Sequence, residues 1–170
     1  MNSTPGGGEF RTVGRLDLSG LSIGDVEVGD VDGDGAPDLV SLSKGTILVL
    51  RTGAERHALD SKVVFNAKLD YFTYWNLRAA DLDVDGADEV LLFDSKKAMF
   101  EVYCTGTGGE LEAVLRHRLV EKTIFQRSKG SGYELPQELE VGDVNGDKRP
   151  DFVCILQDRV AIYLQGDAHK

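Results

Sequence analysis

Side-chain oxygens recur at alternate positions in three short segments of this sequence, and that spacing suits a hard divalent cation. The first segment carries Asp30, Asp32, Asp34 and Asp38, the second carries Asp81, Asp83, Asp85 and Glu89, and the third carries Asp143, Asn145, Asp147 and Asp151. These residues occupy positions 1, 3, 5 and 9 of each segment, and position 7 (Ala36, Ala87 and Arg149) can add a backbone carbonyl. Calcium takes about six to eight oxygen ligands in flexible geometry. The pattern therefore predicts up to three Ca²⁺ sites.

Other metals and the helical calcium loop fit the pattern less well. Magnesium prefers strict octahedral geometry and keeps several waters, and zinc is disfavoured because no His or Cys lies in any of the segments. An EF-hand would carry a bidentate Glu at position 12 between two helices. Here position 12 is Ser41, Leu92 and Cys154, and strand-like residues follow, which excludes the EF-hand.

A loop that wraps around an ion needs a sharp turn at position 6, where glycine is favoured. Gly35 and Gly86 meet that requirement, but Lys148 does not, so the third site is the weakest prediction. The alternative is that these aspartates only form Asx-turns between strands. Three copies in the same phase argue against it, because a turn does not need such a cluster and unneutralised carboxylates repel one another.

The net charge of −10 argues against nucleic acid as a partner, because a nucleic-acid binder needs a basic surface. Eleven of the 29 acidic residues are candidate ligands, and three dications would change the net charge from −10 by +6 to −4. No apolar run is long enough to span a bilayer. Residues 1–14 show no signal peptide and are expected to form a flexible leader.

The flanks of the three segments predict strands. Runs of β-branched and aromatic residues around short polar turns are expected at 38–42 and 46–50, 89–93 and 98–103, and 152–156 and 160–164, with fourth strands near 62–69 and 111–119. The segments recur after 51 and 62 residues, which is the size of one propeller blade. We therefore predict an all-β domain over 15–170, with blades of antiparallel strands in three approximate repeats at 15–65, 66–125 and 126–170.

The segments, written Asp-x-Asp-Gly-Asp-Gly-x-x-Asp between strands, resemble the FG-GAP and VCBS repeats of the integrin-α-type β-propeller over about residues 16–165. Gly35-Ala36-Pro37 matches the Gly-Ala-Pro of that family. The other copies depart to Gly86-Ala87-Asp88 and Lys148-Arg149-Pro150, and the Phe-Gly dipeptide is not evident, which places the chain closer to the looser VCBS type.

The resemblance implies calcium bound within each blade and a propeller that serves adhesion or ligand binding. It also implies export, hence an extracellular or periplasmic location, where abundant calcium suits weak structural sites. Because propellers have about four to eight blades, three repeats suggest the C-terminal arc of a longer bacterial-type protein. A ring closed by a second copy and a capped solenoid are the alternatives.

Three functions follow as hypotheses. The first is a calcium-stabilised module, not an enzyme, that binds a protein or carbohydrate ligand. The second is an appendage or fragment of an exported polysaccharide-processing enzyme, for which His57, His117 and His169 offer no catalytic pattern. The third places a ligand surface on the aromatic residues Tyr71, Phe72, Tyr74 and Trp75, although packing between blades is the favoured explanation for them. Cys104 and Cys154 are expected to be buried free thiols rather than a disulfide.

Overall fold

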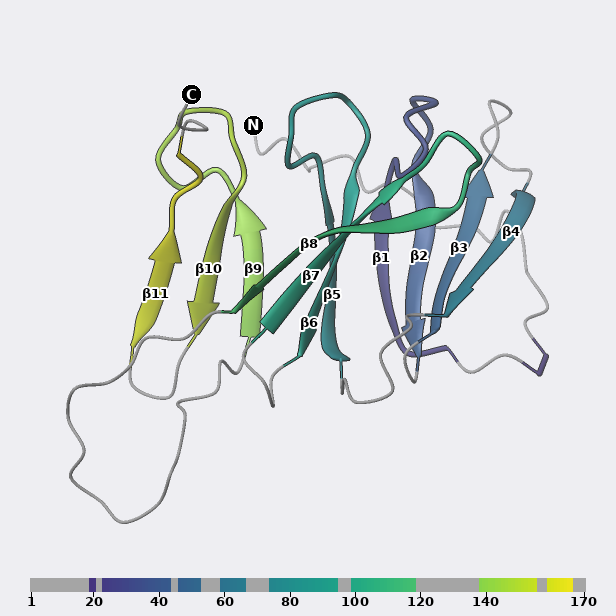
Figure 1. The fold of residues 1–170 in the computed structure, drawn as a ribbon, viewed down its shortest axis with the longest axis horizontal. Helices are drawn as coiled ribbons and strands as arrows, with labels where there is room; N and C mark the ends of the chain where they lie inside the picture. The colour runs from purple at the N-terminus through teal and green to yellow at the C-terminus, as the bar shows by residue number, and fades with distance from the viewer. Residues whose placement is uncertain are drawn as a thin grey trace, which may run out of the picture.

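The computed structural model describes residues 19–20, 23–43, 46–52, 59–66, 74–94, 99–118, 138–155 and 159–166. These residues form an all-β structure without helices, made of three antiparallel sheets (Figure 1). The described residues therefore contain no candidate for a membrane-spanning helix. The predicted leader at 1–14, together with His57, His169, Tyr71 and Phe72, lies outside this part of the chain, as do the side chains of Tyr74 and Trp75.

Each sheet is a meander in which strands adjacent in sequence pair with one another. The first sheet contains β1 (Asp25–Gly29), β2 (Asp38–Ser43), β3 (Thr46–Thr52) and β4 (Leu59–Asn66). The second contains β5 (Tyr74–Ala80), β6 (Glu89–Asp94), β7 (Met99–Thr105) and β8 (Leu111–Arg118). The third contains β9 (Glu138–Gly142), β10 (Asp151–Ile155) and β11 (Val160–Tyr163). The prediction of antiparallel hairpins after each Asp-rich segment is confirmed, and the predicted fourth strands correspond to β4 and β8.

The first strands of the three sheets lie next to one another, β1 beside β5 and β5 beside β9. Each of them leads into an Asp-rich loop, and Figure 1 shows the three loops at the same edge of the molecule. Arg78 on β5 joins this row, because its guanidinium pairs with Glu27 on β1 at 2.9 Å and also with Glu140 on β9. The row of first strands therefore holds the three loops in register.

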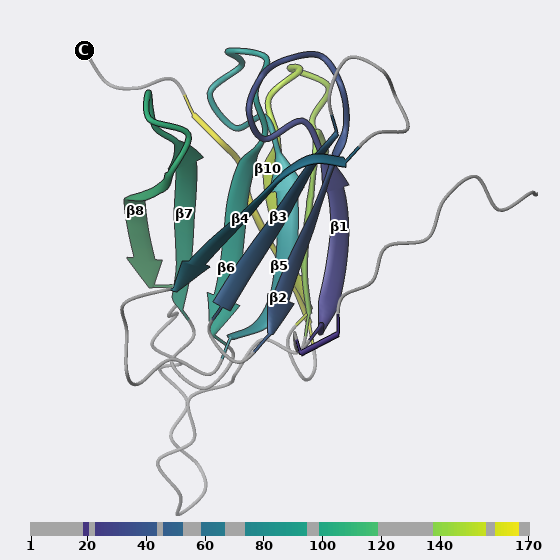
Figure 2. The same ribbon diagram turned by 90° about the vertical axis from the view of Figure 1, so that its right-hand side faces the viewer.

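Two apolar cores lie between the sheets, which are stacked face to face (Figure 2). The core between the first and second sheets includes Val40, Leu42, Ile47 and Val49 of the first and Leu77, Val90, Leu92 and Tyr103 of the second. The core between the second and third sheets includes Leu91, Phe93, Phe100 and Val102 of the second and Leu139 and Cys154 of the third. Alternate residues of β6 therefore face opposite neighbours, as the two-residue period of a strand requires.

Both cysteines are free thiols, as predicted, and they lie in different sheets. Cys154 is buried in the core between the second and third sheets, whereas Cys104 on β7 is only half-buried. Burial raises the pKa of each thiol to about 11.

Candidate metal centre

The three Asp-rich loops share one backbone conformation. At position 6, Gly35, Gly86 and Lys148 all have positive φ angles, of 84°, 98° and 70°. At position 4, Gly33, Val84 and Gly146 also have positive φ angles, of 72°, 64° and 82°. The turn predicted at position 6 is therefore present in all three loops, including the third, where Lys148 adopts a conformation that favours glycine. The requirement at position 4 was missed, although two of its three residues are glycines.

The carboxylate at position 1 organises each loop. In the first loop Asp30 accepts hydrogen bonds from the backbone N–H groups of Asp34 at 3.1 Å and Gly35 at 2.8 Å. Asp81 does the same for Asp85 and Gly86. Asp143 does the same for Asp147 and Lys148. Asx-turns occur as well, since the carboxylate at position 5 accepts the backbone N–H at position 7 in every loop. The Asx-turns of the alternative interpretation are therefore present in all three loops.

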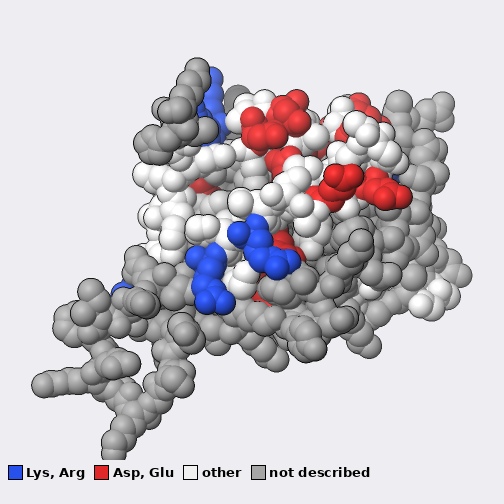
Figure 3. All heavy atoms as spheres, viewed as in Figure 1, with Lys and Arg blue, Asp and Glu red and all other residues white. Residues whose placement is uncertain are grey.

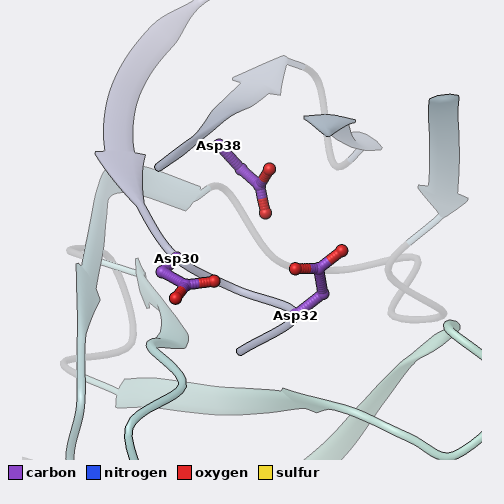
Figure 4. Close-up of side chains that lie close together, drawn as sticks. All are labelled: Asp30, Asp32 and Asp38. Atoms are coloured by element: carbon purple, nitrogen blue, oxygen red, sulfur yellow. The ribbon is translucent and has the colours of Figure 1, made fainter. Parts of the chain in front are cut away.

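Turn formation does not account for the cluster in the first loop. Asp30, Asp32 and Asp38 each bring one carboxylate oxygen within 4.8 Å of the others, and Figure 4 shows the three groups directed into a common space. Asp34 lies outside this cluster, and its Oδ1 accepts the Ala36 N–H at 2.7 Å. Three of the four predicted side-chain ligands are thus brought together from the loop and the start of β2.

Asp38 is the buried member of the first cluster, with 0% of its surface exposed. Its Oδ1 accepts the Thr52 N–H at 2.9 Å, while its Oδ2 is buried without a hydrogen-bond partner among the described residues. Burial and the neighbouring Asp32 carboxylate raise the pKa of this carboxyl group, and the Thr52 hydrogen bond and the nearby Val31 N–H oppose the shift. A buried carboxylate oxygen without a partner is costly, and a bound cation is one way to satisfy it.

The second loop forms a cluster from Asp81, Asp83 and Asp85, again with one oxygen of each within 4.8 Å of the others. Glu89 lies outside it. Its Oε2 accepts the Leu82 N–H at 2.7 Å, and the Cys104 thiol donates to its Oε1 at 3.6 Å. Burial raises the pKa of Glu89. At this position the carboxylate ties the loop to β7.

In the third loop, which the structure describes throughout, no three carboxylates come together in this way. Asn145 donates to Asp147 at 3.1 Å, and both Asp151 oxygens accept backbone N–H groups, from Val144 at 3.0 Å and Gln165 at 2.9 Å. Hydrogen bonds from Arg149 N–H and Asn145 lower the pKa of Asp147. The loop has the backbone of the other two and a less charged ligand set.

A positively charged side chain lies beside the first cluster. Arg51 Nε on β3 lies 3.4 Å from Asp32 Oδ2, and the guanidinium also donates to the Gly109 carbonyl at 2.8 Å. Figure 3 shows most of the visible acidic side chains in the upper half of this face, toward the loops. No pattern in the sequence marks Arg51 as a neighbour of the first loop, because Arg51 lies a full hairpin after that loop.

The first two loops each gather three carboxylates that could hold a metal ion, and oxygen ligands of this kind suit a hard cation. The backbone carbonyls at position 7 (Ala36, Ala87 and Arg149) stay a prediction as ligands. No family model matches the chain, and no curated protein or solved structure matches it either.

Proposed function

We propose that the chain is a calcium-stabilised β-repeat module of the FG-GAP and VCBS type, which serves binding or adhesion and has no catalytic activity. The observation that carries the proposal is the first cluster, in which three carboxylates converge and the buried Asp38 has an oxygen without a partner. The second cluster supports it independently, because the carboxylates of Asp81, Asp83 and Asp85 converge there as well.

Calcium binding is linked to folding in this proposal. Converging carboxylates repel one another, and a dication replaces that repulsion with attraction. A ligand that binds only the folded state adds stability, by about 2.7 kcal/mol when its concentration is one hundred times Kd. Abundant calcium outside the cell or in the periplasm would keep such sites filled, which favours an exported location.

The test is thermal unfolding of the whole chain in excess EDTA and in millimolar CaCl₂. Calcium is expected to raise Tm by several degrees, and magnesium at the same concentration to raise it less. Asp83→Asn should weaken the calcium effect, because it removes a ligand charge while keeping the oxygen that accepts the Asp85 N–H. Glu138→Gln on β9 makes the same charge change at an exposed residue outside the loops and should leave the effect intact. An identical melting curve in EDTA and in calcium would exclude the proposal.

We further propose that the three sheets are consecutive blades of a propeller. Support comes from equivalent positions in the register. Paired residues Val40↔Val49 and Leu42↔Ile47 of the first sheet face the second sheet, and Leu91↔Val102 and Phe93↔Phe100 of the second face the third. The equivalent pairs of the third sheet are Val153↔Ile162 and Ile155↔Val160. Of these residues Ile155, Val160 and Ile162 are exposed. The third sheet therefore has the same apolar face as the other two, but no neighbouring sheet in the described residues covers it.

The first sheet leaves the complementary face open. Val26, Val28 and Leu39 are exposed there, although the equivalent Leu77 and Val90 of the second sheet are buried against the first. A further sheet of the same kind would cover both faces, supplied either by a second copy of the chain or by more of a longer propeller. Sedimentation of this chain tests the first source: a dimer that Ile162→Asp dissociates indicates the second copy, and a monomer excludes it.

A further inference from the structure

The third sheet differs from the other two in its number of strands. The first and second sheets each end in a fourth strand, β4 and β8, whereas the described residues of the third sheet end at β11. β11 is therefore an edge strand in the part of the chain that the structure describes. An edge strand presents backbone N–H and C=O groups that another extended segment can pair with.

A groove lies beside this edge. It has a volume of about 450 Å³. Its walls include Phe100, Val102, Leu115 and His117 of the second sheet and Phe152 and Tyr163 of the third. In the register of the second sheet, His117 pairs with Phe100 and Leu115 with Val102, so β7 and β8 form a continuous floor. The ring centroid of Phe100 lies 4.9 Å from that of Phe152 and 5.4 Å from that of His117, which closes the floor toward the third sheet.

The second sheet shows how a fourth strand packs against the neighbouring sheet. Leu111 of β8, the fourth strand of the second sheet, is only 4% exposed and belongs to the core shared with the first sheet. A fourth strand on the third sheet would occupy the equivalent position against the second. Without one, Leu115 of the groove remains 50% exposed.

We propose that the groove binds an extended segment of a partner protein, which adds to the third sheet as a fourth strand antiparallel to β11. This deepens the proposed interaction role by naming its site, and it rests on that role. The segment has apolar residues at alternate positions, which enter the groove while its backbone pairs with the edge. It carries net positive charge, because the chain has a net charge of −10, which three bound dications would reduce only to −4, and Glu89 is among the residues that line the groove.

The test uses a display library of ten-residue peptides with alternating apolar positions, panned against the calcium-loaded chain. Selected peptides are then synthesised and their binding is measured by fluorescence anisotropy. Leu115→Glu is expected to weaken binding at least tenfold. Ile23→Glu, at an exposed apolar residue that precedes β1 and does not line the groove, is the matched control and should change affinity less than twofold. Leu115→Gln, a milder change, keeps the test valid if the glutamate variant unfolds.

Backbone pairing is tested separately by N-methylation of alternate peptide residues, which removes hydrogen-bond donors without removing side chains. At least tenfold weaker binding is expected for one of the two methylation phases. The proposal is overturned if no peptide is enriched, if selected peptides bind both Leu115 variants as well as the original chain, or if methylation in both phases is without effect. Dimerisation of the chain abolished by Leu115→Gln would also overturn it, by identifying a second copy as the occupant. A calcium-dependent Tm with no peptide binding refutes only this inference and leaves the proposed calcium role standing.

Discussion

Asp88 and Asp30 connect the first two loops through a reciprocal pair of hydrogen bonds. Asp88 N–H donates to the Asp30 carbonyl at 2.7 Å, and Asp88 Oδ2 accepts the Asp30 N–H at 2.8 Å. The equivalent position is Pro37 in the first loop and Pro150 in the third, and proline has no N–H to donate. The departure of the second repeat from the Gly-Ala-Pro pattern therefore has a structural role, because it holds the backbone of one Asp-rich loop against the next.

Removal of the Asp88 carboxylate should destabilise the protein. Asp88→Ala leaves the partly buried Asp30 N–H without its acceptor, at a cost of about 1–3 kcal/mol. Asp88→Asn retains an acceptor oxygen and is expected to recover most of that loss. The free energy of unfolding in urea, measured for both variants in calcium, checks the prediction. Equal stability of the alanine variant and the original chain would contradict it.

Gly29 permits the close approach of these two loops. A Cβ at Gly29 would lie 2.7 Å from both Ala79 Cβ and Asp88 Oδ2, whereas a Cβ at the equivalent Gly142 would meet nothing within 4 Å. Gly29→Ala should therefore cost about 1–3 kcal/mol of stability through overpacking. Gly142→Ala is the matched control and should be nearly neutral. The two midpoints of thermal unfolding decide the matter, and equal shifts would show that packing between the loops is not the cause.

The strands and loops could be predicted because their determinants are local. Strand runs such as 89–93 alternate between two buried faces, and the repeated Asp spacing marks every loop. The convergence of ligands could be predicted only in part. Asp38 and Asp30 belong to one cluster, as predicted. Glu89, which accepts a hydrogen bond from the Leu82 N–H, lies outside the cluster of its own loop. Contacts made across sheets, such as those of Asp88, Arg51 and Arg78, leave no periodic trace in the sequence, because each depends on how two separate sheets pack.

The buried thiol of Cys154 should make stability fall at alkaline pH. Burial raises its pKa from 9.0 to about 11. Below pH 9 the thiol is protonated in both states, so its contribution to stability is fully present. As pH rises from 9 toward 11 the unfolded state loses this proton first, and the contribution is lost. Cys154→Ala should therefore show a smaller decline in unfolding free energy between pH 8.5 and 10.5, measured in urea. An unchanged slope would contradict the assignment.

Val84 should be a source of strain in the second Asp-rich loop. It is a β-branched residue with φ of 64°, at the position where the other loops have Gly33 and Gly146. The left-handed conformation costs a non-glycine residue about 1–2 kcal/mol. Replacement by glycine removes that cost but increases the entropy of the unfolded chain. We therefore expect Val84→Gly to stabilise the protein by about 0.5–1 kcal/mol on balance.

The reverse substitution is the control for that prediction. A Cβ at Gly146 would meet nothing within 4 Å, so Gly146→Val reports on backbone strain without a steric clash. It should destabilise the chain by about 1 kcal/mol. Both variants are compared in EDTA and in calcium, because a strained residue can also limit how readily the loop closes on an ion. If Val84→Gly lowers the stability in both conditions, the positive φ of Val84 does not destabilise the protein. The valine side chain would then stabilise it through its own contacts.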